Sequence, residues 1–224
     1  MEGRFPEVIR IVLTNCTDSS REAEFNKWYD HHLREILGTG VARHGIRYVN
    51  AEPQEGAATY LVIWESGDDD LESLDQRHTQ VTRRLTEQGS MHPALQILRR
   101  AMWRRMEPEF TSASTGVVPV RGAFLLESNC TDAGREDEFN QWYDTMHIPD
   151  FLQTGLFTTA YRFIALPGQH GGKYLAIYET HLDPLSAVNE YSRNHRPRLK
   201  AAGRLSNIID VTWRGIYRQL VSEP

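Results

Sequence analysis

The sequence predicts an α+β protein built from two copies of one β-α-β-β-α-β unit. The first observation is an internal repeat: residues 15–30 read NCTDSSREAEFNKWYD and residues 129–144 read NCTDAGREDEFNQWYD, with twelve of the sixteen positions identical. The second observation is that strand-like and helix-like segments follow in the same order in both halves. A repeat this strong indicates one structural unit built twice, and two units are too few for a solenoid. We therefore predict a pseudo-twofold pair, the internal counterpart of a homodimer.

Each half opens with a short strand and a helix. Residues 8–15 (VIRIVLTN) and residues 120–129 are short and rich in β-branched side chains, which predicts strands. After a polar break, Ser19 and Glu22 fit a capping box, so the first helix is expected to begin near Ser20, and Asp132 is the expected cap in the second half. Large side chains then recur at the spacing of one helical face, which in the second copy holds Phe139, Trp142, Tyr143, Met146 and His147.

The remaining segments complete a ferredoxin-like unit in each half. We expect strands at 42–50 and 59–66, a helix at 70–88 and a strand at 95–106, and their counterparts at 157–166, 173–180, 184–195 and 207–220. These assignments give a first domain at 1–106, a polar linker at 107–118 and a second domain at 119–224. Helices on one face of each sheet leave the other face bare. We expect the two repeats to bury these faces against each other in an intramolecular barrel, so that neither half is stable alone.

The composition excludes several classes of protein. The chain has 224 residues and a formal net charge of −5, which does not suit a nucleic-acid binder. No apolar run approaches the roughly 20 residues that span a bilayer, and the segment MEGRFPE lacks a signal-peptide core, so we expect no membrane partner and a cytoplasmic location. Cys16 and Cys130 occupy equivalent repeat positions and are expected to be free thiols.

The first helix of the second copy resembles a known family. Its motif comprises Asn140, Trp142, Tyr143, Asp144, His147, Ile148, Pro149 and Asp150, followed by Gly155. It resembles the dimeric α+β barrel superfamily, in particular its EthD-like members, and the resemblance covers the chain as a tandem fusion. It implies tandem ferredoxin-like (βαββαβ) repeats that form an intramolecular dimeric α+β barrel, with a cavity between sheet and helices lined by the first helix. The superfamily includes lactone isomerases, polyketide cyclases and dehydratases, cofactor-independent monooxygenases and heme-binding branches.

The candidate catalytic residues are His147, Tyr143 and Asp144. His147 shares a helical face with Tyr143, and a histidine can act as general acid or base near neutral pH without a cofactor. Asp144 could orient the imidazole. The structural alternatives are a core histidine bonded to a carbonyl and an aspartate that bonds only backbone.

The candidate substrate-binding residues are Trp142, Arg162, Asn129, Met146 and Phe151. Arg162 could polarise a carbonyl or phenol, whereas Trp142 and Asn129 also have structural interpretations as a core side chain and a turn residue. The sequence contains no Gly-rich phosphate loop or cysteine metal set, so no metal site is predicted.

The first copy departs from this motif. It has one residue fewer between Asp30 and Gly40 than the second has between Asp144 and Gly155, and it lacks the His-Ile-Pro-Asp sequence. Counted from Phe25, His32 takes the position of Met146 instead of that of His147. Either a local bulge corrects the register or the first copy has lost the site, and we favour loss. His32, with Tyr29 and Asp30, is therefore only a possible second site.

Three functions follow as hypotheses. The first is a cofactor-independent acid/base lyase, isomerase or cyclase/dehydratase that acts on a small aromatic, lactone or polyketide-like substrate. The alternative is a heme or hydrophobic-ligand binding protein with His147 as axial ligand, or a cofactor-independent monooxygenase, on the same scaffold. The third is a non-catalytic structural pseudo-dimer. The expected partner is a small hydrophobic or aromatic molecule, and the pseudo-dimer itself could form a homodimer.

Overall fold

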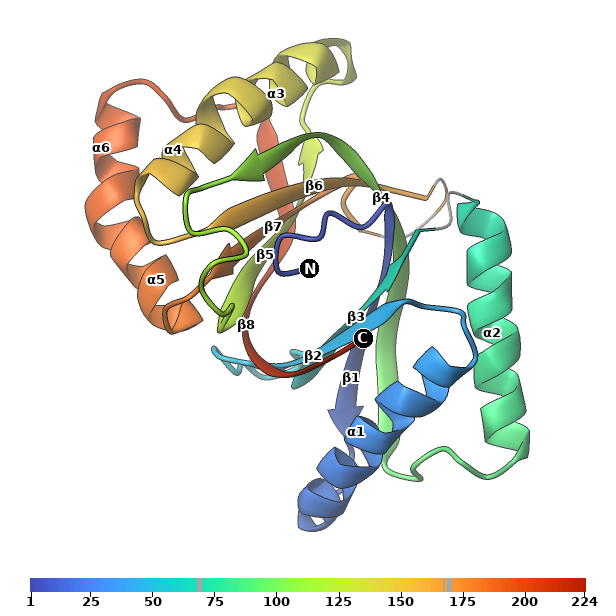
Figure 1. The fold of residues 1–224 in the computed structure, drawn as a ribbon. Coiled ribbons are helices and arrows are strands. Elements are labelled where there is room, and N and C mark those ends of the chain that lie inside the picture. Colours follow the sequence, from blue (N-terminus) through green and yellow to red (C-terminus); the bar gives the residue numbers. More distant parts are fainter. Residues whose placement is uncertain (68–69, 167, 169–170) are drawn as a thin grey trace. The chain divides into compact units, whose positions relative to one another are not determined.

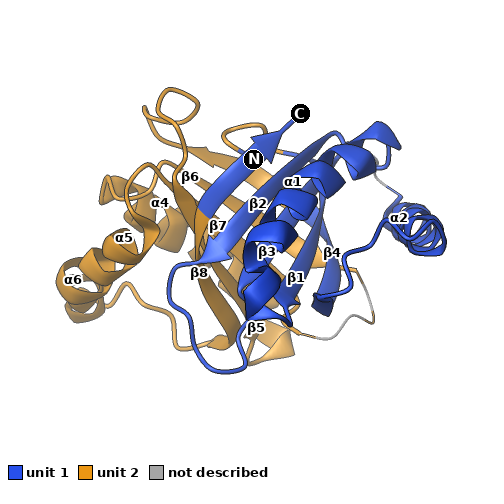
Figure 2. Ribbon diagram, turned by 90° about the horizontal axis from the view of Figure 1, so that it is seen from below, with its two compact units in different colours: residues 1, 6–105, 219–224 blue, residues 2–5, 106–218 orange. Residues whose placement is uncertain are grey.

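The computed structural model describes residues 1–67, 70–166, 168 and 171–224 (Figure 1). The chain forms two compact units, which Figure 2 shows in different colours. Unit 1 comprises residues 1, 6–105 and 219–224, and unit 2 comprises residues 2–5 and 106–218. Each unit therefore holds most of one repeat together with a short segment from the other half of the sequence.

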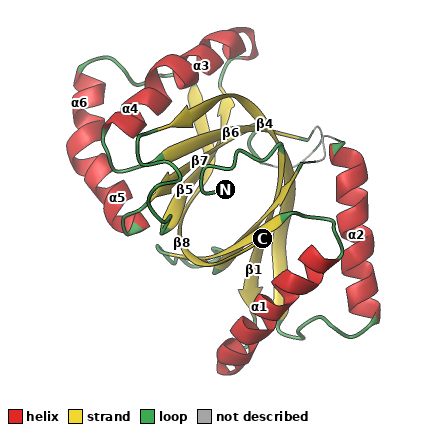
Figure 3. Cartoon of the chain, in the orientation of Figure 1, coloured by secondary structure: helices red, strands yellow, loops and turns green. Residues whose placement is uncertain are grey.

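Unit 1 has the predicted βαββαβ order. Its elements are β1 (Val8–Cys16), α1 (Glu22–Gly38), β2 (His44–Asn50), β3 (Tyr60–Ser66), α2 (Leu71–Glu87) and β4 (Leu95–Thr111). The strands pair antiparallel in the order β4-β1-β3-β2. Both helices lie on the same face of this sheet (Figure 3).

Unit 2 repeats the order with interrupted helices. Its elements are β5 (Gly122–Cys130), α3 (Glu136–Trp142), α4 (Ile148–Gln153), β6 (Thr159–Ala165), β7 (Tyr174–Thr180), α5 (Pro184–Glu190), α6 (Arg196–Ala201) and β8 (Ile209–Glu223). Its antiparallel order is β8-β5-β7-β6. The predicted α+β class is therefore confirmed in both halves.

Some element ends differ from the prediction. Asp18, not Ser19, caps the start of the first helical segment, since its carboxylate accepts from the backbone N–H of Ser20 at 3.0 Å. A 3₁₀ turn over Ser19–Arg21 then precedes α1. Asp132 caps the second copy as expected, accepting from the N–H of Gly134 at 2.9 Å. β4 continues through Thr111, so the first part of the segment expected to be a linker is strand.

Both helical segments of unit 2 contain a π-helical turn, which widens the usual hydrogen-bond ring by one residue. The turns span Tyr143–His147 and Tyr191–His195. Each has the sequence Tyr-x-x-x-His-x-Pro, ending at Pro149 and Pro197. A proline inside a helix has no N–H to donate and clashes with the preceding turn, so the ladder must change there. The corresponding helices of unit 1, α1 and α2, contain no proline and are uninterrupted.

Each π-turn absorbs one extra residue. The chain has one residue more between Asp132 and Gly155 than between Asp18 and Gly40. Both glycines have positive φ and end their helices, so these positions are equivalent. The one-residue difference seen in the sequence is therefore a local widening of the helix in the second copy, and the residues after it return to register.

A β-bulge shifts one strand of unit 2. Glu127 pairs with Trp213 and Ser128 pairs with Val211, so Thr212 is an extra residue on β8. Because a bulge breaks the two-residue alternation of a strand, Val211 and Arg214 can face the same side. That side is the one covered by the helices, since both residues line the cavity described below.

Cys16 and Cys130 are both free thiols, as predicted. Within the described ranges, no helix combines the length and the apolar character needed to cross a bilayer. Over the same residues, no group of three or more His, Cys, Asp or Glu side chains is arranged to hold a metal ion.

Candidate functional site

A cavity of about 360 Å³ lies in unit 2, between the sheet and the helical segments. Its volume is at the lower end of the range for small-molecule sites, which run from about 300 to 1,000 Å³. The lining comes from β5, β7 and β8 on the sheet side and from the segments around the two π-turns on the helix side. The lining is mainly apolar and aromatic, and includes Phe124, Leu126, Trp142, His147, Phe151, Phe157, Tyr178, Val188 and Tyr191.

His147, the last residue of the first π-turn, lies against aromatic rings. It stacks on Trp142 with ring centroids 4.6 Å apart and meets Tyr143 and Phe151 edge-on at 4.9 and 5.1 Å. Neither ring nitrogen has a hydrogen-bond partner among the described residues. Burial lowers the pKa of His147 to about 3, Asp150 opposes the decrease, and Arg162 adds to it. His147 is therefore a neutral imidazole at physiological pH, with an unshared nitrogen lone pair.

Two buried tyrosines lie beside His147 with unpartnered hydroxyls. Tyr178 and Tyr143 are each 1% exposed, and within the described residues neither hydroxyl has a hydrogen-bond partner. Tyr178 lines the cavity, stacks on Phe151 at 4.3 Å and meets His147 edge-on at 6.2 Å. Burial raises the pKa of Tyr178 well above its usual range. Its phenol therefore stays protonated and can donate a hydrogen bond.

Tyr143 is less exposed to the cavity than its neighbour. It does not line the cavity, and the hydroxyl of Ser128 lies close enough to oppose the rise in the pKa of Tyr143 that burial causes. Tyr29 has the same relation to Thr14 in the first repeat. A feature present in both repeats favours a structural role for this tyrosine.

Asp144 does not contact the imidazole. Its Oδ1 accepts from Arg162 Nη1 at 2.7 Å, and Arg162 Nη2 donates to Asn140 Oδ1 at the same distance. The Arg162 guanidinium is 1% exposed and lies 4.5 Å from the centre of the Tyr143 ring. Arg162 therefore ties the helix to β6 and does not reach the cavity, contrary to the expected contact with a substrate oxygen.

The other predicted residues divide between the cavity and the scaffold. Trp142 and Phe151 line the cavity, and Trp142 Nε1 donates to the backbone carbonyl of Arg204 at 2.9 Å. Asn129 instead accepts from the N–H of Lys173 at 2.8 Å, which fixes a loop between strands. Met146 is half-buried and does not line the cavity.

His32 in the first repeat is the structural counterpart of His147. It stacks on Trp28 at 4.8 Å and meets Tyr29 edge-on, as His147 does with Trp142 and Tyr143. The register counted from Phe25, which matched His32 to Met146, is therefore wrong. The π-turn is the local bulge that restores the equivalence.

The two histidines differ in their partners. His32 Nδ1 lies 3.3 Å from Glu35 Oε2. The residue equivalent to Glu35 after the π-turn is Asp150, whose carboxylate instead forms two hydrogen bonds with Arg204 at 2.7 and 2.6 Å. The ring of His147 is thus left without the carboxylate that its counterpart has.

The equivalent space in the first repeat is almost filled. His32 and Tyr29 line a void of about 40 Å³, while Asp30 pairs with Arg47 at 3.0 Å. Larger or longer side chains occupy equivalent positions of the lining: Trp64 replaces Tyr178, and Arg10 replaces Phe124. An aromatic ligand that fits the cavity of unit 2 has no room in the equivalent space of unit 1.

The sequence did not reveal several lining residues. Tyr178 lies on a strand that aligns with Thr59–Ser66 but carried no motif. Tyr191, Ser192 and Arg196 belong to a helix whose turn at Tyr191–His195 was not anticipated. The Tyr-x-x-x-His-x-Pro pattern, present once in each helical segment of the second copy, is the signal that could have identified both π-turns.

The lining residues do not suit a heme. His147 is the histidine that lines the cavity, but a histidine that binds a metal almost always donates its other N–H to a carboxylate, carbonyl or water. Among the described residues His147 has no such protein partner, because Asp150 is bonded to Arg204. A porphyrin with four pyrrole rings also calls for the larger end of the usual pocket range, and this cavity is at the smaller end.

Comparisons with known proteins place the fold. No protein-family model matches the chain. No curated protein sequence matches it significantly either. Solved structures do match over nearly the whole length. A candidate monooxygenase from Fusobacterium nucleatum is 12% identical with a TM-score of 0.55, over 98% of this chain and 95% of that one.

Two further structures give the same result. An anthrone oxidase-like protein is 14% identical with a TM-score of 0.53, over 97% of this chain and 93% of that one. A candidate chlorite dismutase is 15% identical with a TM-score of 0.57, over 96% and 94% of the two chains. These matches confirm the dimeric α+β barrel fold predicted from the sequence, and at such low identity they show the fold alone. Membership of the EthD-like branch stays a prediction.

Proposed function

We propose that unit 2 binds a small aromatic molecule in its cavity and catalyses cofactor-independent oxidation of that molecule by dioxygen. The observation that carries the proposal is the neutral imidazole of His147, with both nitrogens unpartnered among the described residues, in an aromatic cavity of about 360 Å³. Similarity to a candidate monooxygenase and an anthrone oxidase-like protein supports oxidation over the lyase and isomerase chemistry expected from the sequence.

His147 acts as the base in this proposal. A ring nitrogen takes a proton from an acidic carbon or hydroxyl of the bound aromatic. Apolar surroundings disfavour the imidazolium unless an anion forms beside it, and the deprotonated ligand is that anion. The site therefore suits ligands that are themselves fairly acidic, such as phenols or carbons between two activating groups.

Tyr178 stabilises the charge that develops. Its protonated hydroxyl is buried without a protein partner in the described part of the chain, and it lines the same cavity as His147. A buried donor without an acceptor costs roughly 1–3 kcal/mol. A carbonyl or phenolate oxygen of the ligand would remove that cost and would hold its negative charge against a donor already in place.

The oxidation balances without a further reductant. The ligand carbanion or phenolate transfers electrons to dioxygen and a carbon–oxygen bond forms. The remaining C–H bond and the oxygen–oxygen bond then break together, so that the CH₂ group becomes a carbonyl and the second oxygen atom leaves as water with the second carbon-bound proton. His147 returns its proton to that water. The overall change is one CH₂ and one O₂ converted to one C=O and one H₂O.

The test is oxygen consumption with anthrone, a planar carbon acid, as the probe. Wild-type protein should accelerate consumption over buffer, and His147→Ala should lower the enzymatic rate by about 10² to 10⁴, the usual loss for a general base. His32→Ala is the matched control in the other repeat and should leave the rate unchanged.

Two outcomes would refute the proposal. Isomerisation or dehydration of test substrates without oxygen consumption would favour acid/base chemistry alone. A Soret band in the purified protein that disappears in His147→Ala would favour the heme alternative.

A further inference from the structure

Arg196 is a cationic residue of the cavity lining to which the proposed chemistry assigns no role. It is the first residue of α6, directly after the second π-turn, and it lines the cavity. Its guanidinium has no hydrogen bond or ion pair with any described residue. It nevertheless lies close enough to Tyr191 to oppose the rise in the pKa of that phenol that burial causes. The cation is therefore near the cavity and uncompensated.

The charge of the lining differs from that of the chain. The chain has 30 acidic and 25 basic residues, yet the described lining contains Arg196 and Arg214 and no carboxylate. The β8 bulge brings Arg214 to this side. In the first repeat a threonine, Thr82, takes the place of Arg196. The void of the first repeat also has two arginines, since Arg100 takes the place of Arg214 and Arg10 takes that of Phe124. The cation at the Arg196 position, however, belongs to the repeat that has the open cavity.

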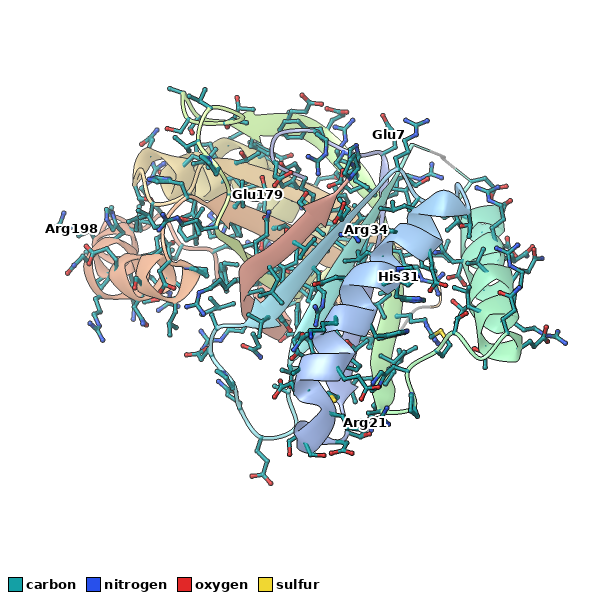
Figure 4. The ribbon with its side chains drawn as sticks, turned by 60° about the horizontal axis from the view of Figure 1, so that its bottom comes forward. Glu7, Arg21, His31, Arg34, Glu179 and Arg198 are labelled. Atoms are coloured by element: carbon teal, nitrogen blue, oxygen red, sulfur yellow. The ribbon has the colours of Figure 1, made fainter. Side chains whose placement is uncertain are left out.

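The side chain of Arg196 is exposed, as a solvated surface arginine would be. Tyr178 distinguishes this site from a plain surface position. The residue is 1% exposed and lines the same cavity, and its buried hydroxyl has no partner among the described residues. Arg198, two residues after Arg196, shows what a surface arginine on this helix looks like. It points outward from α6 and does not line the cavity (Figure 4).

We propose that the ligand of this cavity is an aromatic carboxylic acid with a ring oxygen, its carboxylate held by Arg196 and its ring oxygen by Tyr178. This assignment rests on the proposed ligand-binding role of the cavity and adds the substrate class. Arginine suits the carboxylate because its planar fork matches the two oxygens. The aromatic lining between the two polar contacts suits a flat ring system.

The experiment compares two probes that differ in a single group, 1-hydroxy-2-naphthoate and 1-hydroxy-2-naphthamide. Each is titrated into the full-length protein by fluorescence under anaerobic conditions, so that binding is measured without turnover. Wild-type protein should bind the carboxylate about tenfold more tightly than the amide, as expected for a hydrogen-bonded ion pair in a partly buried site. Raising the salt concentration should reduce this preference.

Variants assign the preference to one residue. Arg196→Gln should bind both probes equally, whereas Arg198→Gln, the same change on the same helix away from the cavity, should keep the tenfold ratio. Tyr178→Phe should weaken both probes alike, since both carry the ring hydroxyl. Equal affinities in the wild type, no binding of either probe, or a preference that survives in Arg196→Gln would each overturn the assignment. An intact preference without oxygen consumption would refute only the proposed function.

Discussion

At the residue scale, His32 and His147 have different surroundings because one neighbouring side chain differs between the two repeats. His32 and His147 have the same stacking partner in their repeats, yet among the described residues only His32 has a carboxylate within hydrogen-bonding distance. Asp150 could have played that part but is bonded to Arg204, where the first repeat has Ser90. One arginine thus turns a carboxylate away from the ring and leaves a neutral base facing an open cavity.

The burial of neutral histidines predicts loss of stability in acid. Burial lowers the pKa of His78 to about 3, and nearby Arg10 and Arg77 add to the effect. The unfolded chain has a histidine pKa near 6.5 and so binds more protons than the folded chain between these values. The free energy of unfolding should therefore fall as pH decreases below about 6.5, by up to about 1.4 kcal/mol per pH unit for this residue.

His78→Gln tests this dependence. Urea unfolding at pH 7 and pH 5 should show that the variant loses less stability than the wild type over that interval, by roughly 1–2 kcal/mol. His31→Gln is the control, because His31 is exposed on α1 (Figure 4). Equal losses in His78→Gln and the wild type would contradict the prediction.

Sequence and geometry agree on the position of three candidate residues. The motif residues His147 and Trp142 and the predicted substrate-binding residue Phe151 all line the cavity, and their roles stay predictions. The motif could not show that Asp144 lies apart from the His147 ring, because two residues close in sequence need not contact the same side chain. The partner of Asp144 is an arginine on a strand, which periodicity within one helix does not reveal.

At the scale of the helices, the second copy differs from the first by a one-residue insertion in each helical segment, and these insertions mark the cavity. Each lengthens a helical segment of unit 2, each is followed by a proline, and each places a cavity residue in or beside a π-turn. π-turns are rare and occur frequently at functional sites. The sequence showed the first length difference but not its structural form, since a deletion in one copy and a widened turn in the other give the same alignment.

Asp144→Asn distinguishes a structural aspartate from a catalytic one. Arg162 is 1% exposed, and its partner Asp144 joins the π-turn to β6, so removal of the charge should lower stability by about 1–3 kcal/mol. The melting temperature should fall by several degrees, while the oxygen-consumption rate well below that temperature should stay within about threefold of wild type.

Asp30→Asn is the matched change in the first repeat. It should destabilise the protein similarly, because Asp30 pairs with Arg47 at 3.0 Å in the same arrangement. If Asp144→Asn instead lowered the rate by 10² or more at an unchanged melting temperature, Asp144 would be an orienting residue after all.

At the scale of the whole molecule, the repeats are not separate along the chain. Residues 2–5 and 106–111 belong to unit 2, and residues 219–224 belong to unit 1. These segments are held by specific contacts: Gly3 N–H donates to the Tyr161 hydroxyl at 2.8 Å, and Arg34 pairs with Glu223 at 3.0 Å. The repeat predicted the two units but not this exchange, because the exchanged segments carry no repeat signal.

Because each unit contains a segment from the other half of the sequence, we predict that the two halves do not fold independently. A fragment of residues 1–107 lacks segment 219–224 of unit 1, and a fragment of residues 118–224 lacks segments 2–5 and 106–111 of unit 2. Each fragment should therefore lack part of its own unit and show no cooperative urea transition when expressed alone. Circular dichroism and size-exclusion chromatography would check this, with the full chain as control. Two monomeric fragments that each unfold cooperatively, with midpoints near that of the full chain, would show instead that the exchanged segments are dispensable.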